Sequence, residues 1–214
     1  MATESTGRGA RDLDAGPFSS WAVATASAIR TGGDADVPCR ECTACCTSSQ
    51  FVHVGPDETE TLAHIPAELL FPAPGLPRGH VLLGYDANGH CPMFVDGGCS
   101  IYEHRPRTCR TYDCRVFEAA EIAPDPDRPR IARQAERWSF RDEAPSDAAR
   151  REAVRTAAAF LADHAHRLPP RIAPSGATQR AALAIEIHEL FLDDSGNVVT
   201  PSPDQIVSAC VSAL

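Results

Sequence analysis

Residues 39–46 read Cys-Arg-Glu-Cys-Thr-Ala-Cys-Cys, which places four cysteines within eight positions. Four more follow at positions 91, 99, 109 and 114, and of the nine cysteines in the chain only Cys210 lies outside these two groups. A Cys-x2-Cys step lets the chain turn around one ion, and thiolates from separate segments complete the tetrahedral sites that zinc prefers. The turn sequences Asn88-Gly89 and Gly97-Gly98 lie just before the first two of the later cysteines. This pattern predicts that both groups of cysteines bind metal.

Cys45 and Cys46 are adjacent, so we expect their side chains to point apart and to serve two different sites. The chain then holds either two four-thiolate centres close together or one cluster beside one ion. Cys91 is followed by Pro92, and a triple Cys-x2-Cys spacing with a remote Cys-Pro is similar to the ligation of iron–sulfur clusters in bacterial ferredoxins. A Cys-x2-Cys step with a later Cys-x4-Cys also fits two zinc sites. Both a 4Fe-4S cluster and zinc therefore stay open as cofactors.

The residues from Met1 to Gly16 are small and polar, with no apolar stretch after a basic start, so we expect no secretory signal. No apolar run in the sequence is long enough to span a bilayer, so no membrane contact is expected. These features predict a cytoplasmic protein whose thiols stay reduced. Clustered cysteines in that setting favour bound metal, with a disulfide framework as the alternative.

The chain has 214 residues, enough for one compact domain or two small ones. All 20 residues in its lysine and arginine total are arginines, so it lacks the lysine that a Schiff base or a Walker phosphate loop requires. The net charge of -9 and the pI near 5.3 argue against general binding of nucleic acid, because such binding requires net positive charge. The sequence indicates no particular protein partner.

Arginines are concentrated beside the cysteines. They are Arg40, Arg105, Arg107, Arg110 and Arg115. Four thiolates around one divalent ion leave about two negative charges, which nearby guanidinium groups would offset while donating hydrogen bonds to the sulfur atoms. The alternative is a site for an anion or a substrate. Arg105 and Arg110, which flank Pro106 and Cys109, are the strongest candidates for contact with the cofactor.

We expect an α+β fold, with a small, irregular, metal-stabilised cysteine-rich domain packed with a mainly α-helical region. The expected segments are a flexible tail over 1–16, a metal-binding domain with a leading helix over 17–118, and a helical region over 119–214. Strands are predicted near 51–54 and 80–85, helices at about 20–31, 146–167, 178–192 and 203–214, and a proline-marked linker at 124–129. Cys210, in the last helix, is predicted to be a core residue.

The predicted metal-binding domain has a thin aliphatic and aromatic core. Between Cys39 and Glu118, 17 of 80 residues are Leu, Ile, Val or Phe, close to the level of disordered chains. A structural zinc ion contributes on the order of 10–16 kcal/mol of apparent binding energy. We therefore expect metal loading to decide whether this part of the chain folds.

The combined cysteine motif resembles a known family. Its parts are Cys39-x2-Cys42-x2-Cys45-Cys46, Cys91-Pro92, Cys99-Ser100-Ile101-Tyr102-x2-Arg105-Pro106-x2-Cys109-Arg110 and Cys114. Residues 39–118 are similar to the YkgJ-type cysteine-cluster family, described as a zinc- or iron-chelating domain and sometimes labelled an iron–sulfur oxidoreductase. The resemblance implies that all eight cysteines are ligands, and it leaves the other motif residues without a role. A similar module occurs in flagellin lysine N-methylases, although this chain shows no glycine-rich nucleotide loop.

Two classes of function follow from these features, and they leave enzymatic activity undecided. The first is a metal-binding protein that holds an iron–sulfur cluster, zinc or both, and that sequesters, senses or delivers metal or takes part in redox chemistry. The second is an enzyme that depends on an iron–sulfur cluster, either an oxidoreductase or a transferase similar to the N-methylases. Outside these two classes, a module for protein interaction that zinc stabilises is a further alternative. An open coordination position, left by a cysteine that does not bind metal, would favour the enzyme.

Overall fold

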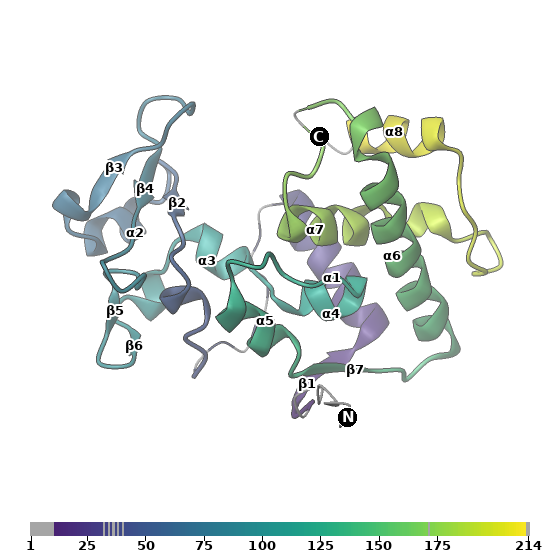
Figure 1. Cartoon of the computed structure of the whole chain (residues 1–214), viewed down its shortest axis with the longest axis horizontal. Coiled ribbons are helices and arrows are strands. Elements are labelled where there is room, and N and C mark those ends of the chain that lie inside the picture. Colours follow the sequence, from purple (N-terminus) through teal and green to yellow (C-terminus); the bar gives the residue numbers. More distant parts are fainter. Residues whose placement is uncertain are drawn as a thin grey trace, which may run out of the picture. The chain divides into compact units, whose positions relative to one another are not determined.

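The computed structural model describes residues 11–31, 33, 35, 37, 39, 41–170 and 172–212. Helices account for 48% and strands for 12% of the structure, which confirms the predicted α+β class. The chain forms two compact units (Figure 1). The cysteine unit spans Thr31–Asp113, and the helical unit consists of the chain up to Arg30 together with the chain from Cys114 onward.

The helical unit is built from six helices and one small parallel sheet in the part of the chain that the structure describes. The helices are α1 (Phe18–Thr31), α4 (Arg115–Ala120), α5 (Pro129–Ala135), α6 (Pro145–His164), α7 (Ala177–Ile187) and α8 (Pro203–Ser212). Short 3-10 turns, Ala165–Arg167 and His188–Phe191, follow α6 and α7. The four long helices confirm the helices predicted from the sequence, whereas α5 follows directly on the predicted linker and was not expected.

Helix α1 belongs to the helical unit, whereas the sequence assigned it to the metal-binding domain. Its first turn is anchored by aromatic packing on strand β7 (Trp138–Arg141). The Phe140 ring lies 5.1 Å from the ring of Phe18 and 4.5 Å from that of Trp21. Because β7 comes much later in the chain than α1, no local sequence pattern predicts this contact.

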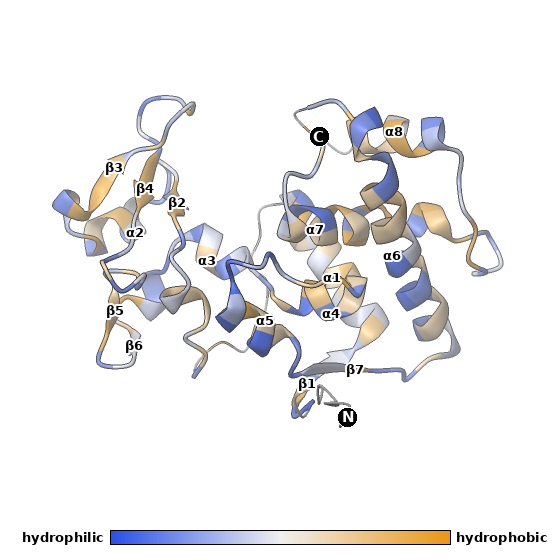
Figure 2. Ribbon diagram, viewed as in Figure 1, coloured by the Kyte–Doolittle hydropathy of each residue, from blue (hydrophilic) through white to orange (hydrophobic). Residues whose placement is uncertain are grey.

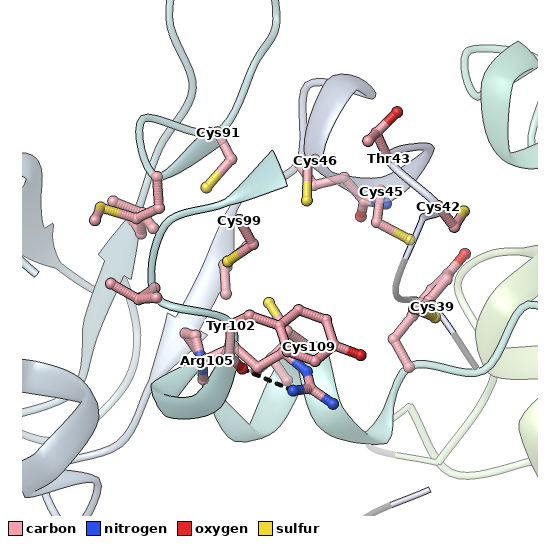
Figure 3. A pocket seen from close by; sticks show the side chains of 18 of the residues that line it. Cys39, Cys42, Thr43, Cys45, Cys46, Cys91, Cys99, Tyr102, Arg105 and Cys109 are labelled. Atoms are coloured by element: carbon pink, nitrogen blue, oxygen red, sulfur yellow. Dashed lines mark hydrogen bonds between the residues drawn. The ribbon is translucent and has the colours of Figure 1, made fainter. Parts of the chain in front are cut away.

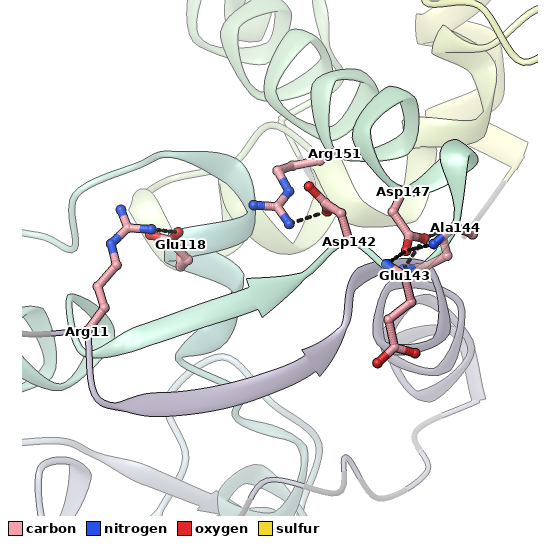
Figure 4. A network of polar contacts seen from close by, with 8 residues as sticks. Arg11, Glu118, Asp142, Glu143, Ala144, Asp147 and Arg151 are labelled. Atoms are coloured by element: carbon pink, nitrogen blue, oxygen red, sulfur yellow. Dashed lines mark hydrogen bonds and ion pairs between the residues drawn. The ribbon is translucent and has the colours of Figure 1, made fainter.

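Strand β1 (Leu13–Pro17) forms where a flexible tail was expected, and residues 1–10 of that predicted tail lie outside the described residues. It pairs in parallel with β7, with Leu13 opposite Trp138. Ala15 is buried, and Arg11, just before the strand, forms an ion pair of 2.6 Å with Glu118 (Figure 4). A short strand without alternating hydrophobicity gives little sequence signal, which explains why it was not predicted.

The start of α6 is fixed by the buried carboxylate of Asp147. It accepts hydrogen bonds from the backbone N–H groups of Glu143 at 2.7 Å and Ala144 at 2.9 Å (Figure 4). It also accepts hydrogen bonds from the hydroxyl and the backbone N–H of Ser19 in α1. The Ser19 hydroxyl, followed by the backbone donors, lowers the pKa of Asp147 to about 2. One carboxylate therefore caps α6 and ties it to α1.

The cysteine unit is a set of short elements joined by turns. Its strands are β2 (Val52–Val54), β3 (Leu70–Pro72), β4 (Val81–Leu83), β5 (Phe94–Val95) and β6 (Gly98–Cys99), and its helices are α2 (Thr59–His64) and α3 (Arg107–Thr111). Strand β4 lies between β2 and β3 in an antiparallel sheet, with Val54 and Pro72 both opposite Val81. Strands β2 and β4 confirm the two predicted strands.

The hydrophobic core of the cysteine unit is small. Figure 2 shows hydrophobic residues concentrated on β2, β3 and β4. Five buried side chains form the centre of this core, namely Val52, Val54, Ile65, Leu83 and Ile101. Cys91 and Cys99 pack against it, so these two cysteines border the core as well as the site described next.

Candidate metal centre

Backbone hydrogen bonds join the first group of cysteines to the second. The N–H of Cys91 donates to the carbonyl oxygen of Cys46 at 2.7 Å, and the N–H of Ser49 donates to that of Gly89 at 2.8 Å. Gly89 has a φ of +77°, and a Cβ atom there would lie 2.3 Å from the Ser49 hydroxyl oxygen. Glycine is therefore required at position 89, both because the backbone there is left-handed and because a side chain would collide with Ser49.

Local hydrogen bonds shape the loop that carries the first group. The N–H of Cys42 donates to the carbonyl oxygen of Cys39 at 2.9 Å, which forms the turn expected of a Cys-x2-Cys step. A 3-10 turn, Cys45–Thr47, follows. The Thr47 hydroxyl donates to the carbonyl oxygen of Thr43 at 2.8 Å, which closes the loop on itself. These hydrogen bonds fix the conformation of the backbone that carries the sulfur atoms of the first group.

Cys91 and Cys99 are positioned by the hairpin of β5 and β6. Phe94 lies opposite Cys99, and the Phe94 N–H donates to the carbonyl oxygen of Cys91 at 2.9 Å. Asp96 and Gly97 connect the strands, and both have positive φ, as a two-residue type I′ turn requires. The turn predicted at residues 97–98 thus lies one residue earlier and still delivers Cys99 to the site.

Cys109 lies in α3, which is anchored to β2. The hydroxyl of Thr108 donates to the carbonyl oxygen of His53 at 2.8 Å. The buried Glu58 carboxylate accepts hydrogen bonds from the N–H of Gly55 at 2.8 Å and from the N–H of Arg107 at 2.5 Å. Glu58 thereby holds the first turn of α3 on the loop after β2. The sequence analysis did not identify this positioning residue, because only its burial sets it apart from other surface glutamates.

Seven of the eight clustered cysteines line one pocket of about 130 Å³ (Figure 3). They are Cys39, Cys42, Cys45, Cys46, Cys91, Cys99 and Cys109. Apolar side chains complete much of the wall, among them Phe51, Leu83, Met93 and Ile101, and these had not been predicted as part of the site. The expectation that distant cysteine groups converge is confirmed for these seven.

The thiols fall into two sets within the pocket. Figure 3 shows the sulfur atoms of Cys46, Cys91, Cys99 and Cys109 around a common space. The sulfur atoms of Cys39, Cys42 and Cys45 gather on the other side of the pocket, and those of Cys45 and Cys46 point apart, as predicted for these neighbours. The first set is called the four-thiol set below, and the second the three-thiol set.

Burial, followed by repulsion from neighbouring thiols, raises the pKa values of Cys46, Cys91 and Cys109. Burial, and then the charges of Cys91 and Cys99, raise the pKa of Cys46 to about 12. Cys109 also reaches a pKa of about 12, through burial and then the charges of Cys46, Cys91 and Cys99. Cys109 is accessible to water because it faces the pocket, yet protein surrounds it on its other sides. Thiolates that destabilise one another in this way are stabilised by a shared cation, which replaces their protons.

Of the two arginines predicted to contact the cofactor, Arg105 lines the pocket and Arg110 does not. The Arg105 guanidinium lies 4.1 Å from the centre of the Tyr102 ring, and its Nη1 donates to the Tyr102 carbonyl oxygen at 2.7 Å. Its positive charge lowers the pKa of Cys109, against the larger effects of burial and of the neighbouring thiols. Arg110 donates to the carbonyl oxygen of Arg105 at 2.7 Å and so positions the backbone of that residue.

The other arginines of the motif region have different environments. Arg107 forms an exposed ion pair of 2.5 Å with Asp57. Arg115 is buried in the helical unit, 5.9 Å from the centre of the Trp138 ring. Arg40 lies outside the described residues. Neither Arg107 nor Arg115 lines the pocket, so the predicted cluster of arginines contributes one described side chain, Arg105, to the pocket wall.

Cys114 is the predicted ligand that does not line the pocket. It is buried in the helical unit, directly before α4, and its sulfur accepts a hydrogen bond of 3.2 Å from the indole N–H of Trp138. Cys210 is fully buried in α8, which confirms its predicted role in the core. No disulfide bond joins any of the nine cysteines, all of which lie among the described residues.

The donor set of the pocket fits zinc or iron–sulfur chemistry. Soft thiolates favour zinc, copper(I) and iron–sulfur clusters, whereas carboxylates and carbonyl groups favour magnesium and calcium. The described residues that line the pocket include no carboxylate and no imidazole. Within the described part of the chain, no group of three or more His, Cys, Asp or Glu side chains is arranged to hold a single ion as it stands.

Residues 38–136 match the CxxCxxCC family, described as a putative zinc- or iron-chelating domain. The match covers 99 of the 214 residues, and this matched segment is called the CxxCxxCC domain below. No curated protein and no solved structure matches the chain. The CxxCxxCC domain contains all seven pocket cysteines, and it continues past the cysteine unit through α4 and α5 of the helical unit. It thus includes Cys114 and all the residues that line the pocket.

Among the helices of the described residues, none has both the length and the apolar character needed to cross a membrane.

Proposed function

We propose that the CxxCxxCC domain binds a 4Fe-4S cluster or zinc through Cys46, Cys91, Cys99 and Cys109. The observation that carries the proposal is the convergence of these four thiols, from a loop, a hairpin and a helix, on one space in the pocket. The raised pKa values of Cys46 and Cys109, with burial as the main cause, mark a site that favours a bound cation over thiolates without one. Together the four cysteines supply the four thiolates that either cofactor requires.

The volume of the pocket favours the cluster over a single zinc ion. A cavity holds one water molecule from roughly 10–15 Å³ upward, and this pocket measures about 130 Å³. It therefore has room for a cofactor of several atoms. When bound, an iron–sulfur cluster supplies one-electron redox chemistry, with a potential set by net charge, hydrogen bonds and exposure.

The chain's own residues would tune such a centre. Leu83, Met93 and Ile101 shield part of the pocket from water, which favours states of lower net charge. Arg105 supplies a positive charge beside Cys109 and offsets part of the charge of the thiolates. We propose a role in redox chemistry or metal handling on this basis, in a reducing compartment such as the cytoplasm, where clustered thiols would stay reduced and able to bind metal.

A zinc-stabilised interaction module is the second candidate, and the small core of the cysteine unit favours it. Cys91 and Cys99 pack against the five buried side chains of that core, so an ion bound there would also hold the unit together. Zinc with four thiolates would then be structural and would leave no position for a substrate.

The test is anaerobic purification with elemental analysis, acid-labile sulfide determination and a visible spectrum. A brown protein with iron and sulfide supports the cluster, and a colourless protein with zinc supports the structural centre. Cys99→Ser should lose metal in either case, whereas the matched control Cys210→Ser, at a buried cysteine far from the motif, should keep it. Folded protein free of iron and zinc after anaerobic purification would refute the proposal.

A further inference from the structure

We propose that Cys46 and Cys91 form a reversible disulfide when the pocket is without metal, and that hydrogen peroxide is the oxidant that forms it. Metal and this disulfide exclude each other, because both use the same two sulfur atoms. The exclusion rests on the proposed function, since it requires that the four-thiol set binds metal. The inference goes beyond that function because it assigns an oxidative modification to two named residues.

A direct backbone contact joins the two residues within the cysteine unit. The N–H of Cys91 donates to the carbonyl oxygen of Cys46 at 2.7 Å. Residues that form such a hydrogen bond across neighbouring strands have Cα atoms about 5.5 Å apart, and disulfides usually join Cα atoms about 4.4–6.8 Å apart. The hydrogen bond therefore brings the two residues within the range that a disulfide requires.

The two side chains face the same space. Figure 3 shows the sulfur atoms of Cys46 and Cys91 turned toward the common space of the four-thiol set. Among the neighbouring charges that raise the pKa of Cys46, after burial, that of Cys91 has the largest effect, ahead of those of three other pocket cysteines. Because the repulsion between two charges grows as they approach each other, this order indicates that Cys91 is the nearest of these thiols to Cys46.

Backbone donors favour Cys91 as the thiol that reacts first. Burial raises the pKa of the Cys91 thiol, whereas the backbone N–H groups of Met93 and Phe94 donate hydrogen bonds to its sulfur and oppose this effect. Hydrogen bonds from N–H groups stabilise the negative charge of a thiolate. The thiolate is the form of cysteine that attacks a peroxide, so these donors assign the first step to Cys91 and the second to Cys46.

The reaction balances with one molecule of hydrogen peroxide. The Cys91 thiolate attacks a peroxide oxygen, the O–O bond breaks, and the released hydroxide takes up a proton to become water, which leaves a sulfenic acid on Cys91. The Cys46 sulfur then attacks the Cys91 sulfur, the S–S bond forms, and the sulfenic oxygen leaves as a second water molecule with the proton of the Cys46 thiol. Two thiols are oxidised, and the peroxide is reduced to two molecules of water.

The disulfide removes two of the four ligands of the proposed centre. Cys99 and Cys109 remain, and two thiolates are fewer than either zinc or a 4Fe-4S cluster requires. Conversely, a bound ion engages the sulfur lone pairs that attack a peroxide, so the loaded site resists oxidation. The pocket of about 130 Å³ has room for a peroxide molecule when it holds no metal. The four-thiol set therefore has two exclusive forms, one reduced and loaded, the other oxidised and free of metal.

Disulfide mapping by mass spectrometry tests the pairing. Metal-free protein, prepared with a chelator under anaerobic conditions, receives one equivalent of hydrogen peroxide, and its digest is analysed without reduction. The first disulfide to form should join Cys46 to Cys91. Cys46→Ser and Cys91→Ser should not form it, whereas the matched variants Cys99→Ser and Cys109→Ser, which also lack one thiol of the four-thiol set, should. A first disulfide between any other two cysteines would overturn the proposal.

Thiol titration and metal analysis test the exclusion between disulfide and metal. Zinc-loaded protein should lose thiols to peroxide more slowly than metal-free protein, by about tenfold or more. The oxidised protein should take up zinc at the four-thiol set only after dithiothreitol has reduced the disulfide. Equal rates of thiol loss with and without zinc would refute the exclusion. If the reduced protein binds neither zinc nor iron, the proposed function fails and the exclusion with it, whereas the mapping on metal-free protein still decides the pairing.

Discussion

Removal of the metal should unfold the cysteine unit and leave the helical unit folded. A structural metal site contributes on the order of 10–16 kcal/mol, whereas a whole domain is stable by about 5–15 kcal/mol. The core of the cysteine unit offers five buried aliphatic side chains, each contributing about 1.5–3 kcal/mol before the chain entropy is counted. The bound metal therefore matches or exceeds the stability that the rest of this unit can supply.

The assay is hydrogen exchange measured by mass spectrometry on metal-loaded protein and on protein stripped by a chelator under anaerobic conditions. A loss of about 10 kcal/mol corresponds to about seven orders of magnitude in the opening equilibrium, so the protection of β2 and β4 should vanish. The helical unit is an internal control, since α1, α6 and α7 pack on one another or on β7 without any pocket residue.

The boundary between loss and retention of protection is itself part of the prediction. It should fall near Asp113, so that α4, with Val116 and Phe117 buried in the helical unit, stays protected. The sequence alone had suggested that the metal-dependent part extends to Glu118. Unchanged protection of β2 and β4 in the stripped protein would refute the reasoning, because the cysteine unit would then be stable without metal.

Three further outcomes follow from individual contacts. Asp147→Asn should lower the free energy of unfolding of the helical unit by about 2 kcal/mol at pH 7, as urea unfolding would show. Because folding lowers the pKa of the Asp147 carboxyl to about 2, the difference in stability between wild type and variant should shrink as the pH falls from 4 to 2. Gly89→Ala should reduce metal retention, measured by elemental analysis, more than Gly97→Ala does. Both glycines have positive φ, but a Cβ at position 89 would collide with the Ser49 side chain, whereas a Cβ at position 97 would meet no other atom. Metal binding at pH 7 should release about four protons, one from each thiol of the four-thiol set, and calorimetry in buffers of different ionisation enthalpy would measure this number. The affinity for metal should fall as the pH falls, because the thiols of Cys46 and Cys109 have pKa values of about 12 and must lose their protons to bind.

The parts of the structure that the sequence predicted are those that local chemistry decides. The glycine turns before Cys91 and Cys99 have the left-handed backbone expected of them, although the second turn is displaced by one residue. Strands β2 and β4 follow from short runs of β-branched and leucine residues between turn signals. These features depend on a few neighbouring residues, so one sequence contains the information needed to predict them.

The parts that the sequence did not predict depend on contacts between distant segments. The parallel pair of β1 and β7, and the packing of Phe18 on Phe140, join residues more than a hundred positions apart. The alternating pattern of β7 covers only four residues, which is too short to indicate its partner strand. The assignment of α1 to the wrong segment has the same cause. Glu58 is a similar case, because its role depends on the N–H of Arg107, which a local pattern does not show.

Cys114 shows that spacing alone does not tell which cysteines line the pocket. In the sequence it completes a Cys-x4-Cys step with Cys109, and nothing in the residues between them distinguishes the two sulfur atoms. In the structure Cys109 faces a pocket lined by six other thiols, whereas Cys114 accepts an indole N–H inside the helical unit. Which sulfur atoms can share a metal depends on the donors that the fold brings beside each of them, and spacing along the chain does not give this. Within the pocket, the thiols fall into the four-thiol and three-thiol sets for the same reason, because the fold and not the spacing decides which sulfur atoms face one another.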